Sequence, residues 1–101
     1  MIRAVFEVKD ERYVSLDVRG HALSNEYGKD LICASVSSIM FGFMNALDAL
    51  ELEVDIRQTE NRITVIDRSD SDTVQNYFKL VIMQLKTIEV SYGDFIKVER
   101  K

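Results

Sequence analysis

IRAVFEVK, residues 2–9, and RYVSLDVR, residues 12–19, are two runs in which apolar and polar residues alternate. A period of two is typical of β-strands with one buried face, and the polar pair Asp10-Glu11 between the runs predicts a hairpin. In the first run Ile2, Ala4, Phe6 and Val8 share one face. In the second, the alternation predicts that Val14, Leu16 and Val18 face the core and that Tyr13, Ser15, Asp17 and Arg19 lie opposite.

The long apolar segment that follows predicts a helix. Residues 31–47 contain no charged side chain, and Ile32, Val36, Ile39, Phe43 and Leu47 recur at helical spacing. The segment barely reaches the length of a bilayer span and contains several polar residues, so we expect a buried helix rather than a membrane anchor. Because it is apolar almost all round, it needs cover from a sheet on one side and from another helix or a second subunit on the other.

The remaining patterns complete a regular order of elements. Leu52, Val54 and Ile56 predict a third strand, Thr59-Glu60-Asn61 a turn, and residues 62–67 a fourth strand. Residues 73–91 predict a second helix whose polar side includes Gln75, and residues 95–99 a last strand. The order ββαββαβ predicts a single α+β domain over residues 1–101, with a mixed or antiparallel sheet packed by two helices.

Charge and cysteine content narrow the possible functions. The net charge is −4, which argues against general affinity for nucleic acid and favours a basic peptide or protein as partner. A single cysteine cannot form an internal disulfide, and the first residues already alternate like a strand rather than forming a signal peptide. We therefore expect a cytoplasmic protein with no membrane association.

The only histidine and the only cysteine, His21 and Cys33, lie 12 positions apart around a glycine-containing loop. Asp30 is a candidate N-cap, which would place Cys33 in the first helical turn, where free N–H groups and the helix dipole favour a thiolate. The hairpin would bring His21 to the same helix start. If the two side chains meet, they form the nucleophile and base of a cysteine hydrolase. A lone cysteine is otherwise most often core filler.

Neighbouring residues offer supporting roles. Asp30 could cap the helix or orient the His21 ring, and Ser37, one turn after Cys33, could contact the sulfur. Backbone N–H groups near Cys33 and Ala34 are candidate oxyanion donors, and residues 22–29 could form a lid with hinges at Gly20 and Gly28. One cysteine and one histidine are too few soft ligands for a metal site, so neither a metal nor a cofactor is expected.

GHA at residues 20–22, EYGKD at 26–30 and ICASVS at 32–37 resemble the signature of the Prp family of ribosomal-processing cysteine proteases. Residues 23–25 are Leu-Ser-Asn where the family usually has small residues, and Ser35 stands where it more often has alanine. The resemblance implies that His21 and Cys33 are the catalytic pair. It also implies a homodimer that removes the N-terminal extension of a basic protein of the large ribosomal subunit, protein twenty-seven.

Two functions of other classes remain open at this point. The chain could be a non-catalytic ribosome-assembly module that grips a basic peptide, or a structural homodimer in which Cys33 is incidental. Only the protease interpretation requires Cys33 to be accessible and reactive.

Overall fold

The computed structural model describes residues 1–20 and 29–101, and within these ranges the chain forms five strands and two helices. The strands are β1 (Ile2–Lys9), β2 (Arg12–Arg19), β3 (Val54–Thr59), β4 (Arg62–Asp67) and β5 (Ile96–Arg100). The helices are α1 (Lys29–Ala49) and α2 (Asp72–Tyr92). The predicted order ββαββαβ is confirmed.

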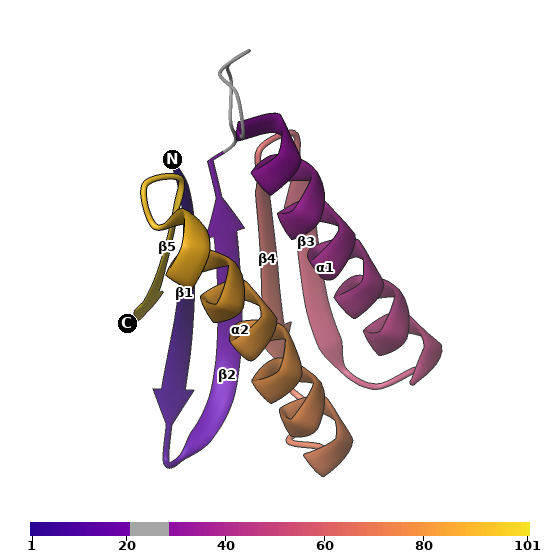
Figure 1. The fold of residues 1–101 in the computed structure, drawn as a ribbon. Helices are drawn as coiled ribbons and strands as arrows, with labels where there is room; N and C mark the ends of the chain where they lie inside the picture. The colour runs from indigo at the N-terminus through magenta and orange to yellow at the C-terminus, as the bar shows by residue number, and fades with distance from the viewer. Residues whose placement is uncertain (21–28) are drawn as a thin grey trace.

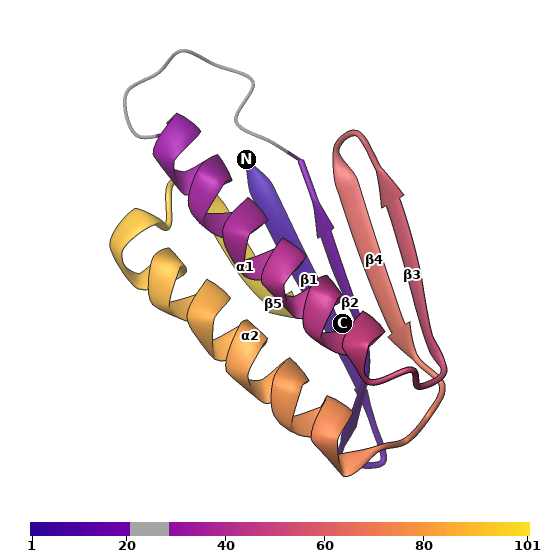
Figure 2. The same ribbon diagram turned by 90° about the vertical axis from the view of Figure 1, so that its right-hand side faces the viewer.

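The strands form one mixed sheet in the order β3-β4-β2-β1-β5, in which β5 runs parallel to β1 and the other neighbours are antiparallel. Both helices lie on the same face of this sheet (Figures 1 and 2), and the described residues leave the other face uncovered. The molecule therefore has one helical layer and one sheet layer. α1 and α2 pack against each other as well as against the strands. The apolar surface of α1 extends almost all round the helix, and α2 covers part of the side that does not face the sheet.

The core lies between the helices and the covered face of the sheet. Phe78 of α2 is fully buried, and its ring packs at 5.2 Å from Phe43 of α1 and at 6.1 Å from Tyr13 of β2, measured between centroids. Of the four residues predicted to share one face of β1, Ile2, Ala4 and Phe6 are buried, and Val8 is partly buried against the core. Apolar burial of this extent is the main stabilising contribution in a domain of this size.

The second strand differs from its predicted alternation because it contains a bulge. The register of β1 and β2 shifts beside Val14, so that Glu7 pairs with Ser15 but Val8 pairs with Tyr13. Tyr13 consequently packs against the core, and Val14 turns to the uncovered face of the sheet. The expectation for both residues was wrong, because an extra residue in a strand reverses the alternation on one side of it.

Gln75 holds the bulged segment in place. We expected Gln75 on the polar side of the second helix, but it is 4% exposed. Its Oε1 accepts a hydrogen bond from the Tyr13 N–H at 2.7 Å, and its Nε2 donates one to the Tyr13 carbonyl at 2.7 Å. The prediction for Gln75 was wrong because the spacing of apolar residues in a helix does not show that the backbone of another segment, here Tyr13, lacks hydrogen-bond partners.

The hairpin turn is also tied to the start of α2 by ion pairs. The Arg12 guanidinium contacts Asp72 at 2.7 Å and Asp70 at 2.9 Å, and Asp72 first, then Asp70, raises the pKa of Arg12 above its ordinary value. Asp10 and Glu11 both have positive φ, which matches a tight hairpin turn. The Ser71 side chain accepts a hydrogen bond from the Val74 N–H and caps α2.

Two smaller differences concern element ends. β3 begins at Val54, and Leu52, which we expected within this strand, precedes it and is 41% exposed. α1 begins at Lys29, one residue before its predicted cap. Residues 31–49 of α1 are long and apolar enough to cross a membrane by composition. In the fold, α1 buries Ile32, Val36, Met40 and Leu47 as a core helix.

Candidate active site

Cys33 is a partly exposed thiol on the face of α1 that looks toward the sheet, and it forms no disulfide. It is the fifth residue of the helix, so it lies slightly farther from the helix start than predicted. The Cα–Cβ bonds of a helix tilt toward its N-terminus, which directs the sulfur back over the first turn. Cys33 is therefore not core filler, because it reaches a cavity that solvent can enter.

A cavity of about 100 Å³ lies beside Cys33. Its walls come from the first half of α1, from Ile2 of β1, from the end of β2 at Val18 and Gly20, and from residues 58–63 around the turn that joins β3 to β4. The sheet order explains this meeting, because β4 is the direct neighbour of β2 and places its turn next to the end of that strand. The cavity is open to solvent and bordered by a thiol.

Gly20 occupies a position that only glycine fits. Its φ is +83°, and a Cβ atom there would clash with the Met1 carbonyl oxygen. The Gly20 N–H donates to the Asn61 carbonyl at 3.1 Å, which fastens the end of β2 to the β3–β4 turn. The backbone immediately before His21 is thus held against the wall of the Cys33 cavity.

The structure changes the roles predicted for residues around the helix start. Because α1 begins at Lys29, Asp30 lies within its first turn and does not occupy the N-cap position. In a helix with these bounds the Ala34 N–H bonds to the Asp30 carbonyl, so Ala34 is not a free oxyanion donor as predicted. Ser37 lines the same cavity as Cys33, whereas the hydroxyl of Ser35 donates to the Leu31 carbonyl at 2.8 Å.

Several predicted site residues lie outside the described residues. These are His21, Gly28 and most of the expected lid over residues 22–29, and the side chain of Asp30 is not described either. The distance between His21 and Cys33 and the hinge role of Gly28 therefore remain predictions. Within residues 1–20 and 29–101, no group of three or more His, Cys, Asp or Glu side chains could hold a metal ion.

The contribution of the β3–β4 turn to the site was not predicted. Residues 59–61 were identified as a turn, but nothing in the sequence indicated that Gln58, Glu60 and Asn61 would line the cavity next to Cys33. Their position depends on the order of strands in the sheet, which a single sequence does not reveal.

Comparison with known proteins decides the family. A sequence model described as cysteine protease Prp matches residues 1–97. The chain belongs to the Prp family of cysteine proteases. It is 34% identical to the ribosomal processing cysteine protease Prp of Staphylococcus aureus over the full length of both chains. It is 31% identical to the Prp of Bacillus subtilis, with 88% of this chain and 87% of that one covered.

Solved Prp structures share the fold. Prp from S. aureus in complex with a substrate peptide superimposes with a TM-score of 0.91 at 28% identity, covering both chains completely. A second structure of the S. aureus protease, with a covalently linked product peptide, gives a TM-score of 0.89 at 29% identity. As a member of this family, the chain is a cysteine protease. The two non-catalytic interpretations, an assembly module and a purely structural homodimer, are therefore set aside.

Proposed function

We propose that Cys33 and His21 are the catalytic pair of this protease and that its substrate is the N-terminal extension of a basic protein of the large ribosomal subunit, protein twenty-seven. The observation that carries the proposal is the Cys33 cavity: the chain's only thiol lines it, and so does Gly20, the residue directly before its only imidazole. The relatives are named ribosomal processing proteases, which supports the choice of substrate.

The proposed reaction has two halves. The Cys33 thiolate attacks the scissile carbonyl carbon, and the His21 imidazolium protonates the departing amine, leaving an acyl thioester on Cys33. His21 then takes a proton from water as that water attacks the thioester, and the released sulfur completes the cycle with the peptide acid as second product. A relative crystallised with a covalently linked product peptide is consistent with a covalent route.

The helix start supports the sulfur electrostatically. The first N–H groups of α1 have no partner within the helix, and the positive end of its dipole lies over the first turn, toward which Cys33 points. We assign two further residues supporting roles at Cys33. Asp30 lies in the same first turn of α1, and Ser37 lies in the wall of the cavity. Residues 22–29, with Gly20 as the anchored end, would close over the bound peptide.

Charge supports a basic substrate. The chain carries 17 acidic and 13 basic side chains, and Glu60 contributes a carboxylate to the rim of the cavity. Arg62, the basic residue that also lines the cavity, is paired with Asp17 at 2.8 Å. A cationic peptide is therefore attracted toward the site, and this attraction weakens as salt screens it. Such a substrate belongs to the cytoplasm, where we place the protein.

The direct test is cleavage of a synthetic peptide that spans the junction of this extension, followed by mass spectrometry. Wild-type protein should give two fragments, and Cys33→Ala should give none while it still binds the peptide. Ser35→Ala is the matched control, because Ser35 lies two residues away on α1 and bonds the Leu31 carbonyl instead of lining the cavity. Cleavage by Cys33→Ala at the wild-type rate would overturn the proposal.

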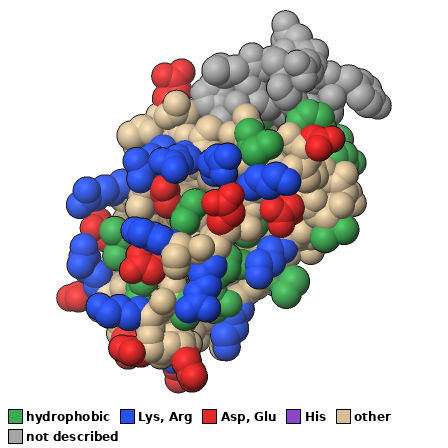
Figure 3. Space-filling model, turned by 90° about the vertical axis from the view of Figure 1, so that its left-hand side faces the viewer, with side chains coloured by type: hydrophobic (Ala, Val, Ile, Leu, Met, Phe, Trp, Pro, Cys, Tyr) green, Lys and Arg blue, Asp and Glu red, His purple; other side chains and the backbone are tan. Residues whose placement is uncertain are grey.

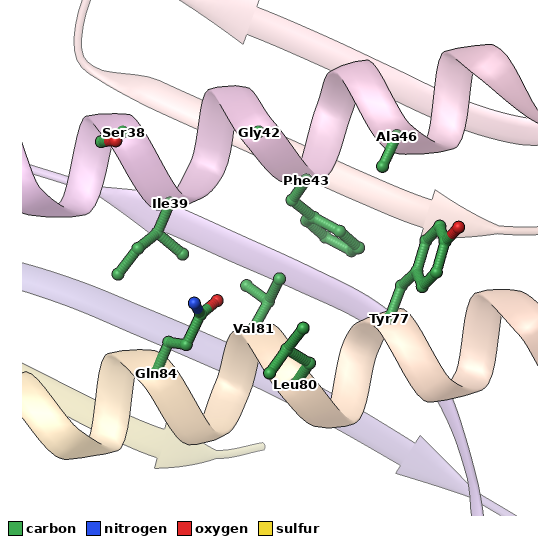
Figure 4. Close-up of a pocket in the computed structure, with 9 residues that line it drawn as sticks. All are labelled: Ser38, Ile39, Gly42, Phe43, Ala46, Tyr77, Leu80, Val81 and Gln84. Atoms are coloured by element: carbon green, nitrogen blue, oxygen red, sulfur yellow. The ribbon is translucent and has the colours of Figure 1, made fainter.

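We also propose that the enzyme is a homodimer joined through its helical layer. A groove of about 460 Å³ runs between α1 and α2, and in Figure 4 Ile39 and Phe43 point toward Leu80 and Val81 across it. Gly42 lies exposed in the middle of α1, and a Cβ atom at this position would have nothing within 4 Å. A glycine there costs about 1 kcal/mol of helix stability relative to alanine, which close approach of a second copy would explain.

Exposed apolar side chains of α2 lie in and beside this groove, and they provide the test. Leu80, which lines the groove, is 59% exposed, and Met83, one turn farther along the helix, is 61% exposed. Sedimentation velocity should show a dimer for the wild type and a monomer for Leu80→Glu combined with Met83→Glu. Leu52→Glu, at a similarly exposed leucine outside both helices, should remain dimeric. A wild-type monomer at micromolar concentration would contradict the proposal.

A further inference from the structure

The uncovered face of the sheet carries a row of four basic residues on four adjacent strands. Lys97 of β5 is paired with Arg3 of β1, Arg3 with Arg19 of β2, and Arg19 with Arg62 of β4. The alternation of each strand puts these side chains opposite the buried residues next to them, such as Ile2, Ile96 and Val18. We call these four residues the basic row.

The basic row is costly for the fold and exposed to solvent. Like charges directly across neighbouring strands are destabilising, and this row contains three such pairs in succession. The side chains of Arg3 and Arg62 are 48% and 51% exposed, and Arg19 and Lys97 are exposed as well. Carboxylates in the next row compensate in part, with Glu99 at 2.8 Å from Arg3 and Asp17 at 2.8 Å from Arg62.

The uncovered face as a whole has the opposite charge balance to the chain. Its outward positions on the five strands, with Lys101, carry more cations than anions, whereas the chain has a net charge of −4. Figure 3 views the flank that bears β5 and shows Lys and Arg side chains gathered there, with acidic ones between them. The net charge of the chain therefore does not exclude nucleic acid as a ligand of this face.

We propose that the basic row binds the sugar–phosphate backbone of RNA. Three of its four residues are arginines, whose planar guanidinium groups match phosphate oxygens. The uncovered face carries no aromatic ring among the described residues, since Tyr13 and Phe6 pack on the covered side, so bases have nothing to stack on. Recognition through phosphates without stacking predicts binding that is independent of sequence and strongly sensitive to salt.

RNA fits this face better than an acidic peptide or a membrane. The large apolar side chains that the described residues expose belong to the helices and connections, none to a strand. The apolar residues in the hollow on this face, Val5, Val14 and Ile66, are only partly exposed and lie among charged neighbours, so they offer a protein partner or a bilayer little to hold. The choice of RNA among polyanions rests on the proposed ribosomal function. Arg62 also lines the Cys33 cavity, so bound RNA would lie next to the site that receives the peptide.

The test measures fluorescence anisotropy of a labelled RNA duplex titrated with the full chain at about 50 and 200 mM salt. Arg3→Gln with Lys97→Gln removes two cations from the row and touches no residue of the cavity. Lys79→Gln with Arg100→Gln removes the same two charges at exposed positions outside the row and is the matched control. The row variant should bind about tenfold more weakly, with a salt slope smaller by about one to two, and the control should bind like the wild type.

Three results would overturn the proposal: no RNA binding by the wild type at low salt, equal losses in the row and control variants, or tighter binding of polyglutamate or of anionic lipid vesicles than of RNA. Thermal melting establishes that each variant is folded. If the row variant unfolds, Arg19→Gln alone takes its place, with an expected loss of about threefold. Cleavage of free peptide is measured in parallel, so that failure of RNA binding is separate from failure of the protease proposal.

Discussion

The two faces of the sheet differ in almost every physical respect. The covered face holds the aromatic cluster around Phe78 and supports α1 with Cys33, whereas the uncovered face is crossed by ion pairs and charged rows. Alternating side chains of the same five strands supply both surfaces. Stability is therefore concentrated on one side of the sheet, and the other side is available for charged partners.

The largest effect should come from the centre of the covered face. Phe78→Ala removes a fully buried ring that contacts Tyr13 and Phe43, and we expect the free energy of unfolding to fall by about 3–5 kcal/mol in urea denaturation. Ile66→Ala on the uncovered face is the comparison, with an expected loss below about 1 kcal/mol. Equal losses for the two variants would show that the faces do not differ as described.

A somewhat smaller effect is expected at Gly20, where β2 ends beside the Cys33 cavity. Gly20→Ala forces a side chain into positive φ and against the Met1 carbonyl, and it should lower the free energy of unfolding by about 2–4 kcal/mol. Gly42→Ala is the matched control when both variants are measured in the monomeric background of Leu80→Glu with Met83→Glu, because its Cβ meets no atom of the same chain. A Gly20→Ala protein as stable as the wild type would contradict the geometry assigned to the end of β2.

Next in size is the hydrogen bonding of the bulge. Gln75→Leu keeps the volume but leaves the Tyr13 N–H and carbonyl without partners, which should cost about 1–3 kcal/mol in the same assay. Gln58→Leu, at an exposed glutamine of β3 outside the helical groove, is the control and should be close to neutral. If Gln75→Leu is neutral too, the bulge does not depend on this side chain.

The smallest effect should come from the uncovered face. Asp17 accepts hydrogen bonds from Arg62 and Thr64, and its hydrogen bond and then its charge raise the pKa of Arg62. Because the Arg62 side chain is half exposed, Arg62→Gln should lower the urea midpoint only slightly, and the change should shrink further in high salt. A large, salt-independent decrease of the midpoint would mean that this ion pair is far better shielded than its exposure indicates.

The sequence predicted the elements well because apolar spacing determines them directly. The strands at residues 2–9, 12–19 and 62–67 have the predicted bounds, and both helices were placed within about two residues. The reversal of Tyr13 and Val14 was not predictable, because it requires the pairing of β1 with β2 and the hydrogen bonds of Gln75. Likewise, the basic row exists only through the order of strands, since its members lie as far apart as residues 3 and 97.

For the site, the sequence singled out Cys33 and correctly favoured a protease. It did not indicate that the β3–β4 turn would form a wall of the cavity, because local patterns define elements but not which of them meet. It also placed the first residue of α1 two positions too late, because the ends of helices are poorly defined by apolar spacing.

The proposed chemistry depends above all on Cys33 being an activated nucleophile paired with His21, and the rate at which iodoacetamide alkylates Cys33 at neutral pH is the sharpest test of this pairing. We expect rapid alkylation of Cys33 in the wild type and a large decrease in His21→Ala, with both proteins equally stable to heat. Alkylation as slow as that of an ordinary thiol, or equally fast with and without His21, would show that the pair does not exist.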